Sequence, residues 1–272
     1  MVLPVSAGAI RKLVREVAAP GPDDHVFAVG GADELAPELR QQFLRGHAEP
    51  GAVRLGDPEG ADVYVHVLAV APGDEDFRML RRARRARVSA IAVAVGLAEP
   101  TTIPYVLATD VVRVGAGEPF PLEAIAHAIA AGLGEHGAPL AARVPLLRTA
   151  VSDQLVASFA RKNGIVAAAV WTPGADLPLL ALNEVRLLLR LAQAHGAARD
   201  VRDRLPELAA VLGAGFGLRA LARELLGLVP GAAWVVKAGV AYAGTRALGE
   251  AARLRFALAP TQQLGGAARA AP

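Results

Sequence analysis

The chain contains no cysteine and only three lysines, which are Lys12, Lys162 and Lys237. Without cysteine there is no disulfide, no thiolate nucleophile and no sulfur-ligated metal site. The basic residues are almost all arginine, and the formal net charge of +3 makes only a weak long-range field. The abundance of Ala, Gly, Pro and Arg favours a GC-rich genome as its cause. A surface selected to bind polyanions is the alternative.

Sequence patterns that usually mark an enzyme are also missing. No serine lies in a G-x-S-x-G sequence, and the six histidines show neither H-E-x-x-H nor another close ligand pair. His66 lies inside an apolar strand and is interpreted as a core histidine. The acidic run from Asp74 to Asp76 is interpreted as a helix start rather than a cation site. We predict no catalytic residue, no metal ligand and no cofactor.

The chain is rich in apolar residues: 53% of its 272 residues are hydrophobic and only 20% are charged. This length suits one large domain or two small ones, each with its own core. Near the start, Ile10, Leu13, Val14 and Val17 fall at helical spacing between charged residues. This pattern predicts a short basic amphipathic helix rather than a signal peptide. Such a helix packs on its own domain or, alternatively, lies on an anionic membrane.

The first half alternates strand-like and helix-like segments, which is typical of a parallel sheet with helical crossovers. A purely apolar strand such as VSAIAVAV belongs in the middle of such a sheet, where both faces are covered. The expected strands are 25–30, 53–55, 62–70, 88–95 and 111–114, and the expected helices are 34–45, 74–87 and 121–134.

The pattern changes near Glu135, where strand signals fade and long Leu- and Ala-rich segments follow. We predict helices over 140–162, 177–195, 206–226 and 232–258, with a shorter apolar piece at 165–171. The predicted fold class is α/β plus all-α. It comprises a parallel-sheet domain over 1–135, a helical bundle over 136–259 and a disordered tail over 260–272.

Three segments of the first half follow one another in a familiar order. The strand VFAVGG (Val26–Gly31) stands where a P-loop would follow, and Asp57-Pro-Glu-Gly60 has the D-x-x-G form of a switch-II motif. The strand VSAIAVAVGL ends where N-K-x-D would stand. Over roughly residues 20–135 this layout resembles a GTPase domain of the Era type. The resemblance implies a nucleotide-binding fold.

The residues that would bind the nucleotide are absent from this layout. A P-loop uses glycines, a lysine and a Ser or Thr to hold the phosphates and Mg²⁺, but the chain after Gly30 runs GADELAP. No lysine occurs between residues 13 and 161, and no asparagine precedes Asn163, so no shift of the alignment supplies them. The domain is therefore predicted to be a pseudo-GTPase that performs no phosphoryl transfer.

The segment FRMLRRARRAR places six arginines on one helix. Arg78, Arg82 and Arg85 share one stripe of this helix, and Arg81 and Arg84 share another. Apart from one phenylalanine the run holds no aromatic residue, so base stacking is not supported and no nucleic-acid partner is predicted. The favoured interpretation is a solvated outer helix, and contact with anionic lipid is the alternative.

The helical half carries the more distinctive motifs. Thr172–Gly196 contains PGADLP and LNEVR, and Leu228–Ala252 contains AGTRALGEAA. Over about residues 145–257 these motifs resemble, in order and spacing, a YcjF-like bacterial domain of unknown function that follows Era-type GTPase domains in some chains. The resemblance implies an association with GTPases and often with membranes, and it implies no defined activity.

One helix of this half carries a narrow polar stripe on an apolar surface. Asn183, Arg186, Arg190 and Gln193 fall at i, i+3, i+7 and i+10, and the helix around them is expected to be buried. Two arginines four residues apart repel unless an acid lies between them. The expected acid, in an internal ion-pair network, is Asp176, Glu207, Glu224 or Glu250. A stripe that binds a partner or a lipid headgroup is the alternative.

The last helix is rich in glycine and alanine, which lets neighbouring helices approach closely. Arg246 and Glu250 form an i, i+4 pair on it. Leu225–Thr245 is long enough to span a bilayer, but glycines and a proline interrupt it and Lys237 lies near its middle. A soluble or peripheral bundle is favoured over a true span.

These observations predict a bacterial, non-catalytic adaptor or regulatory protein. It is expected in the cytoplasm, peripheral to or inserted in the inner membrane, with a protein partner or a membrane surface. The alternatives are an integral membrane component with spanning C-terminal helices and an enzyme of unrecognised type that uses the cleft at the strand ends. The candidate interaction residues are Asp176, Asn183, Arg186, Arg190, Lys237, Arg246 and Glu250.

Overall fold

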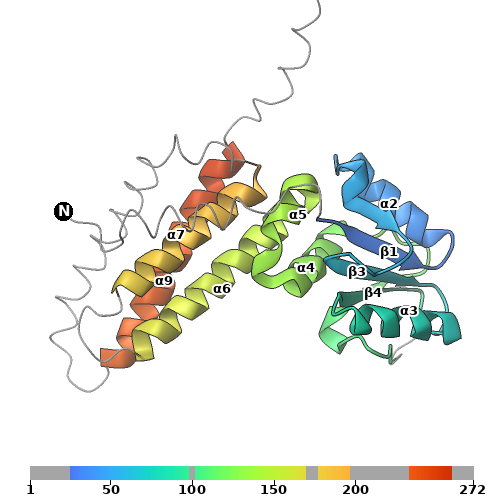
Figure 1. The fold of residues 1–272 in the computed structure, drawn as a ribbon, viewed down its shortest axis with the longest axis horizontal. Coiled ribbons are helices and arrows are strands. Elements are labelled where there is room, and N and C mark those ends of the chain that lie inside the picture. Colours follow the sequence, from blue (N-terminus) through green and yellow to red (C-terminus); the bar gives the residue numbers. More distant parts are fainter. Residues whose placement is uncertain (1–24, 98–101, 170–176, 197–232, 259–272) are drawn as a thin grey trace, which may run out of the picture.

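The computed structural model describes residues 25–97, 102–169, 177–196 and 233–258. Within these ranges a five-stranded parallel sheet is followed by a group of helices, and the two parts lie end to end (Figure 1). The predicted fold class of α/β plus all-α is confirmed. The amphipathic helix expected near the start, the helix expected over 206–226 and the tail 260–272 lie outside the described residues.

All neighbouring strands of the sheet run parallel, in the order β2-β1-β3-β4-β5. This is a common order of doubly wound sheets. β3 is buried at every position, as a central strand with both faces covered must be. The observed strands agree with the expected ones to within a few residues: β1 Phe27–Gly31, β2 Val53–Leu55, β3 Val63–Leu68, β4 Ser89–Val95 and β5 Val111–Val114.

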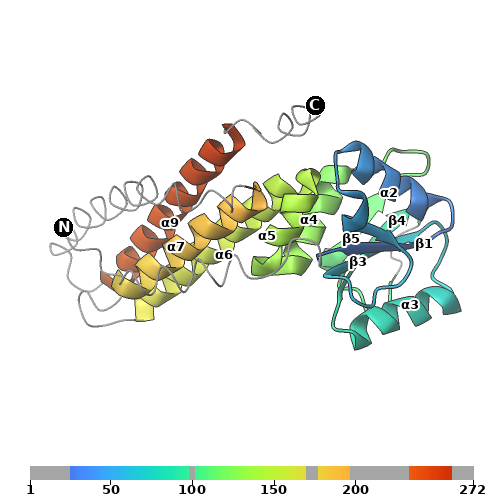
Figure 2. The ribbon, with the colours of Figure 1, turned by 45° about the horizontal axis from the view of Figure 1, so that its top comes forward.

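Helices cover the sheet on both faces (Figure 2). α2 (Leu35–Arg45) and α4 (Leu122–Leu133) share one apolar cluster on one face, and α3 (Asp74–Arg85) packs in a second cluster on the other. Successive side chains of a strand point to opposite faces. Strand β3 therefore sends Val63, Val65 and Val67 toward α2 and α4, and it sends Tyr64 and Leu68 toward α3.

Three long helices lie side by side in the helical half (Figure 1). They are α6 (Arg148–Ala169), α7 (Leu177–Ala194) and α9 (Ala233–Leu258). The last two agree with the predicted helices to within a residue. The helix predicted over 140–162 was wrong as a single element. The structure has α5 (Ala138–Arg143), a 3-10 turn over Pro145–Leu147 and then α6, which includes residues 165–169 of the apolar piece expected at 165–171. Residues 170 and 171 lie outside the described residues.

The break before α6 has a local cause. Pro145 has no N–H to donate within a helix, and its ring disfavours helical geometry at the preceding residue. Val144 accordingly adopts φ −122° and ψ 89°. The chain changes direction here: α5 packs against α6 and α7, and α6 runs away from the sheet (Figure 1).

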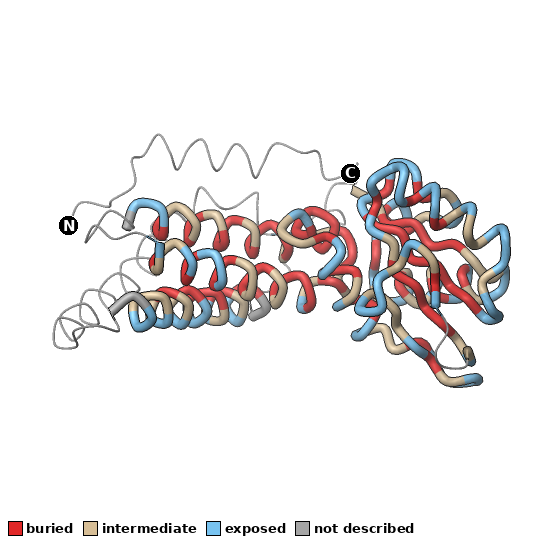
Figure 3. The backbone as a smooth tube through the Cα atoms, turned by 90° about the horizontal axis from the view of Figure 1, so that it is seen from below, coloured by how far each residue is buried: buried red, intermediate tan, exposed pale blue. Residues whose placement is uncertain are grey.

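Buried positions continue from the sheet into the helices (Figure 3). One cluster of buried side chains includes Val65 of the sheet, Ile129 of α4, Leu155 of α6 and Leu187 of α7. The predicted domain boundary between residues 135 and 136 falls inside the 3-10 turn Gly134–His136, and the core extends across it. The two halves are therefore joined by packing as well as by the chain.

None of the described helices has both the length and the apolar character needed to cross a membrane. Of the candidate span Leu225–Thr245, residues 225–232 lie outside the described ranges, and the remainder belongs to α9.

Candidate functional site

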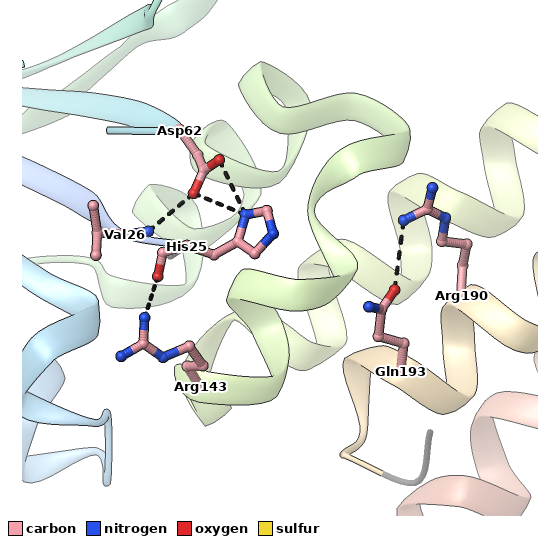
Figure 4. Close-up of polar contacts among 6 residues, drawn as sticks. All are labelled: His25, Val26, Asp62, Arg143, Arg190 and Gln193. Carbon is pink, nitrogen blue, oxygen red and sulfur yellow. Dashed lines mark hydrogen bonds and ion pairs between the residues drawn. The ribbon is translucent and has the colours of Figure 1, made fainter. Parts of the chain in front are cut away.

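The helical half is attached at the edge of the sheet where the strands begin (Figure 4). Arg143, the last residue of α5, is 7% exposed. Its guanidinium donates to the carboxylate of Glu49 at 2.7 Å and to the carbonyl oxygen of His25 at 2.6 Å. Asp62, which precedes β3, accepts hydrogen bonds from the Val26 N–H at 2.9 Å and from the His25 ring at 3.2 Å. The carboxyl ends of the strands therefore lie at the opposite edge of the sheet and face away from the helical half, which consists of α5, α6, α7 and α9.

The turn from β1 to α2 lies at the point of the sheet where doubly wound proteins bind ligands. β1 is flanked by β2 on one side and β3 on the other, and only Ala32, Asp33 and Glu34 connect it to α2. The Ala32 N–H donates to the carbonyl oxygen of Val67 at 2.9 Å. Gly31 has a φ of +101°, and a Cβ added to it would lie 2.0 Å from the same oxygen. The turn is closed tightly against β3.

The charge of this turn is negative as well. Asp33 and Glu34 are both exposed, and Glu34 stands at the N-cap of α2 without a side-chain cap. A phosphate at this helix start would meet two carboxylates, where a P-loop offers a lysine and an arc of N–H groups. The geometry and the charge both oppose a bound phosphate here.

The tetrapeptide Asp57-Pro-Glu-Gly60 forms a turn held by neighbouring arginines. The Asp57 carboxylate accepts the Glu59 N–H at 2.9 Å and pairs with Arg82 of α3 at 2.8 Å. Arg82 also pairs with Glu59 at 3.0 Å. Arg54 donates to the carbonyl oxygens of Asp57 and Glu59 at 2.8 and 2.5 Å. The polar groups of this turn are thus engaged by the chain itself.

A hydrogen-bonded chain of Tyr64, His66 and Asp76 lies between β3 and α3. The Tyr64 hydroxyl is 2.9 Å from His66 Nδ1, and His66 Nε2 is 2.8 Å from Asp76 Oδ1. Burial lowers the pKa of His66, although the hydrogen bond and charge of Asp76 oppose the shift. The ring is therefore neutral at neutral pH, donates from Nε2 to Asp76 and accepts the Tyr64 O–H at Nδ1.

This arrangement confirms that His66 is a core histidine with satisfied nitrogens, since its side chain is 1% exposed. The second oxygen of Asp76 accepts the Gly73 N–H at 2.8 Å, at the start of α3. The interpretation of the acidic run as a helix start is confirmed by its place in the first turn of α3. The Tyr64–His66–Asp76 chain links β3 to α3, and its tyrosine and histidine are buried.

A second polar network joins the three long helices. Asn183 of α7 donates to Asn163 of α6 at 2.8 Å, and Asn163 donates to the Thr245 hydroxyl of α9 at 2.8 Å. The Thr245 hydroxyl donates to a carboxylate oxygen of Glu184 at 3.4 Å. Asn163, Glu184 and Thr245 are each 0% exposed. This network allows one alignment of the three helices along their axes and disfavours others, because a slip would bury polar atoms without their partners.

The structure brings together only part of the predicted stripe. Asn183 enters the buried network, while Arg190 lies 3.5 Å from Gln193 on the same helix (Figure 4), and Arg186 is half-buried. Of the four expected acids, Glu250 pairs with Arg253 at 2.8 Å rather than with the stripe. The other three, Asp176, Glu207 and Glu224, lie outside the described residues.

The candidate residues of α9 have their own contacts. Arg246 donates to the Tyr242 hydroxyl at 3.3 Å instead of pairing with Glu250, and Lys237 is half-buried near the start of the helix. The expectation that small residues let helices approach is confirmed at Gly249, where an added Cβ would lie 2.6 Å from the Val156 side chain of α6.

The outer face of α3 is strongly basic. Arg78 pairs with Glu75 at 2.8 Å, and Arg82 pairs with Asp57 and Glu59 as described above. Tyr105, from the connection between β4 and β5, lies with its ring centroid 5.8 Å from the Arg81 guanidinium and 5.6 Å from that of Arg84. Four arginines of this region are exposed and contact no acid within the described ranges: Arg81, Arg84, Arg85 and Arg87.

Sequence reasoning missed several residues that organise these contacts, among them Glu184, Arg143 and Tyr105. Glu184 had a recognisable signal, since it is the one acid of α7, and an acid on a helix expected to be buried requires an internal partner. Arg143 and Tyr105 had none, because the first contacts a residue 94 positions away and the second lies in a connection outside the arginine run. No protein-family model, no curated protein and no solved structure matches the chain. The assignment of a function therefore rests on these contacts.

Proposed function

We propose that this protein is a non-catalytic adaptor whose sheet domain keeps the layout of an Era-type GTPase but binds no nucleotide. The β1–α2 turn carries this proposal. A phosphate-binding loop needs a long arc of free backbone N–H groups and a positive side chain. Here Ala32, Asp33 and Glu34 make up the whole connection, and the Ala32 N–H is already bonded to Val67 at 2.9 Å.

The turn after β2 supports the same conclusion. A switch segment responds to the nucleotide because its polar groups exchange partners between two states. In the Asp57–Gly60 turn, Arg54 holds two carbonyl oxygens and Arg82 holds the carboxylates of Asp57 and Glu59. A turn held by four such contacts is suited to a constant surface rather than to a nucleotide-dependent one.

The junction between the halves supports an adaptor role. Arg143 binds Glu49 and the His25 carbonyl, and a shared apolar core lies around these contacts. Surfaces on the sheet and on the helices are thereby held at a constant separation and orientation. The partner of such a protein is a membrane surface or another protein that contacts these surfaces.

Nucleotide binding by the purified full chain tests this proposal. Titration calorimetry with GTP, GDP and ATP in the presence of Mg²⁺ is expected to give no binding tighter than about 1 mM, and incubation is expected to release no phosphate. Stoichiometric binding with Mg²⁺-dependent hydrolysis would overturn the proposal.

A matched variant separates charge from geometry. The double substitution Asp33→Ser and Glu34→Lys removes the negative charge of the β1–α2 turn but leaves its length and its Ala32–Val67 bond unchanged. This variant is also expected to bind no nucleotide. If it gained binding, charge alone would have prevented a competent site, and the closed turn would not be what excludes the phosphate.

A further inference from the structure

We propose that the outer face of α3 binds the anionic headgroups of a lipid bilayer. The surface, called here the arginine surface, consists of Arg81, Arg84 and Arg85 of α3, Arg87 two residues after its end, and Tyr105 of the connection between β4 and β5. The inference rests on the proposed adaptor function and names the chemistry of the partner. It also revises the favoured interpretation of the arginine run as a merely solvated helix face.

The charge on the arginine surface is not compensated by the chain. Of the six arginines between residues 78 and 87, Arg78 and Arg82 are paired with Glu75, Asp57 and Glu59. The other four are exposed and contact no acid in the part of the chain that the structure describes. Electrostatic attraction in about 0.1 M salt acts over only about 10 Å. The local cluster therefore decides binding, and the small net charge of +3 does not oppose it.

Tyr105 orders two members of the surface. Its hydroxyl accepts a hydrogen bond from Arg81 Nε at 3.2 Å, and its ring lies near both the Arg81 and the Arg84 guanidinium groups. The terminal nitrogens of these arginines remain available for phosphate oxygens, which a guanidinium binds with two parallel hydrogen bonds. Tyr105 adopts a φ of +68°, a conformation uncommon for a non-glycine residue and often associated with binding sites.

An exposed apolar residue follows the ordered tyrosine. Leu107 is 70% exposed and lies two positions after Tyr105 in the same connection. A basic helix face accompanied by exposed leucine and tyrosine is typical of segments that lie at a membrane surface, where the apolar groups enter the boundary between headgroups and acyl chains. α3 forms the outermost layer of the sheet part on this side, so a flat surface can reach it (Figure 2).

A nucleic acid fits this surface less well than a bilayer does. Single-stranded nucleic acids bind by stacking successive bases on aromatic side chains, and among the described residues the ring that these arginines contact is that of Tyr105 alone. An exposed leucine also contributes nothing to a contact with phosphates. The ligand that fits the arginine surface is therefore an anionic lipid surface.

Vesicle co-sedimentation with the full chain tests the inference. The probes are vesicles of phosphatidylcholine alone and vesicles with about one third phosphatidylglycerol. The protein is expected to bind only the second kind, and the binding is expected to weaken as salt shortens the electrostatic range. Each arginine near an anionic membrane contributes about a fivefold gain in partitioning. The variant Arg84→Gln/Arg85→Gln/Arg87→Gln is therefore expected to bind about 100-fold more weakly.

The control variant removes the same number of exposed arginines from other places. It is Arg45→Gln/Arg78→Gln/Arg161→Gln, in which Arg45 belongs to α2, Arg78 is already paired with Glu75, and Arg161 belongs to α6. Its binding is expected to stay within about fivefold of the unmodified protein. Leu107→Ser is expected to weaken binding without changing its dependence on salt, because it removes an apolar contact only.

Three results would overturn the inference. The first is that the protein does not bind the anionic vesicles. The second is that the two triple variants lose vesicle binding to the same extent. The third is that the protein binds an oligonucleotide more tightly than the vesicles and that this binding depends on the arginines. Failure of vesicle binding alone leaves the adaptor proposal intact with a protein as its partner. Nucleotide binding would contradict the adaptor proposal but would not change the vesicle result. The failure of one proposal can therefore be distinguished from the failure of the other.

Discussion

Arg143 and Glu49 hold each other through two reciprocal hydrogen bonds. The Arg143 guanidinium donates to the Glu49 carboxylate at 2.7 Å, and the Glu49 N–H donates to the Arg143 carbonyl oxygen at 2.9 Å. Arg143 ends α5, and Glu49 immediately precedes the turn that leads into β2. The pair therefore joins the helical half to the sheet at a single point where both the side chains and the backbone take part.

Loss of the Arg143 side chain is expected to destabilise the whole protein. The variant Arg143→Ala leaves the His25 carbonyl and the Glu49 carboxylate without their buried donor, which costs about 2 kcal/mol in the free energy of unfolding. Urea unfolding measures this change. Arg161→Ala, at an exposed arginine of α6, is the control and is expected to change stability by less than about 0.5 kcal/mol. Equal midpoints for the two variants would show that the junction does not depend on Arg143.

Three glycines provide a graded test of the closed β1–α2 turn. Gly31→Ala combines a φ of +101° with a backbone oxygen 2.0 Å from the new Cβ, so a loss of about 3 kcal/mol or more is expected. Gly56→Ala shares the positive φ of +100° but has no atom of the described residues within 4 Å of the new Cβ, and a loss of about 1 kcal/mol is expected. Gly239→Ala, in α9 with no described atom within 4 Å of the added Cβ, is expected to gain about 1 kcal/mol.

Urea unfolding of the three glycine variants gives the order directly. A Gly31→Ala protein as stable as Gly56→Ala would mean that β1 does not approach Val67 as closely as the structure has it. A Gly239→Ala protein that loses stability would place that position of α9 against a neighbour.

The stability of the fold is expected to decrease as the pH falls below about 6.5, the ordinary pKa of histidine. Burial lowers the pKa of His66 in the folded state, and burial together with Arg148 and Arg253 lowers that of His195. Above the unfolded pKa both states are neutral and the two groups have no effect. As the pH falls below the pKa of the unfolded state, the two histidines take up protons in the unfolded chain but not yet in the folded one. The free energy of unfolding therefore decreases until the pH reaches the lower pKa values of the folded state.

Urea unfolding at a series of pH values from about 7.5 down to about 5 measures this slope. His66→Gln is expected to be less stable at the upper end, because it disturbs the bonds to Tyr64 and Asp76, but to show a flatter dependence on pH. His195→Gln is expected to remove a further part of the slope. An unchanged slope in both variants would contradict the lowered pKa values.

The buried network of the helical half is expected to require a hydroxyl at residue 245. Thr245→Val keeps the shape of the side chain but leaves the Asn163 amide without its acceptor, at a cost of about 1–3 kcal/mol. Thr245→Ser keeps the hydroxyl and is expected to cost less. Thermal or urea unfolding compares them, and a more stable valine variant would show that the network contributes nothing to stability.

The elements of the fold were largely predictable because their signals are local. The alternation of apolar segments gave the five strands and their helices to within a few residues. The prediction of a single helix over 140–162 was wrong, because it did not take Pro145 into account. Proline removes a helical N–H wherever it occurs. The candidate site was harder to predict. Asn183 was correctly noticed as polar on an apolar helix, but its partner Asn163 lies 20 residues away on another helix.

The sequence by itself determined the fold class and the absence of a lysine or asparagine where a GTPase needs them. Both follow from residue identity and from spacing within a segment. Only the tertiary structure decided that Arg143 reaches Glu49, that Tyr105 lies beside Arg84, and that Asn163 meets Thr245. Periodicity tells which face of an element is buried. A hydrogen bond of about 3 Å depends instead on how whole elements are placed against one another, and no local pattern contains that placement.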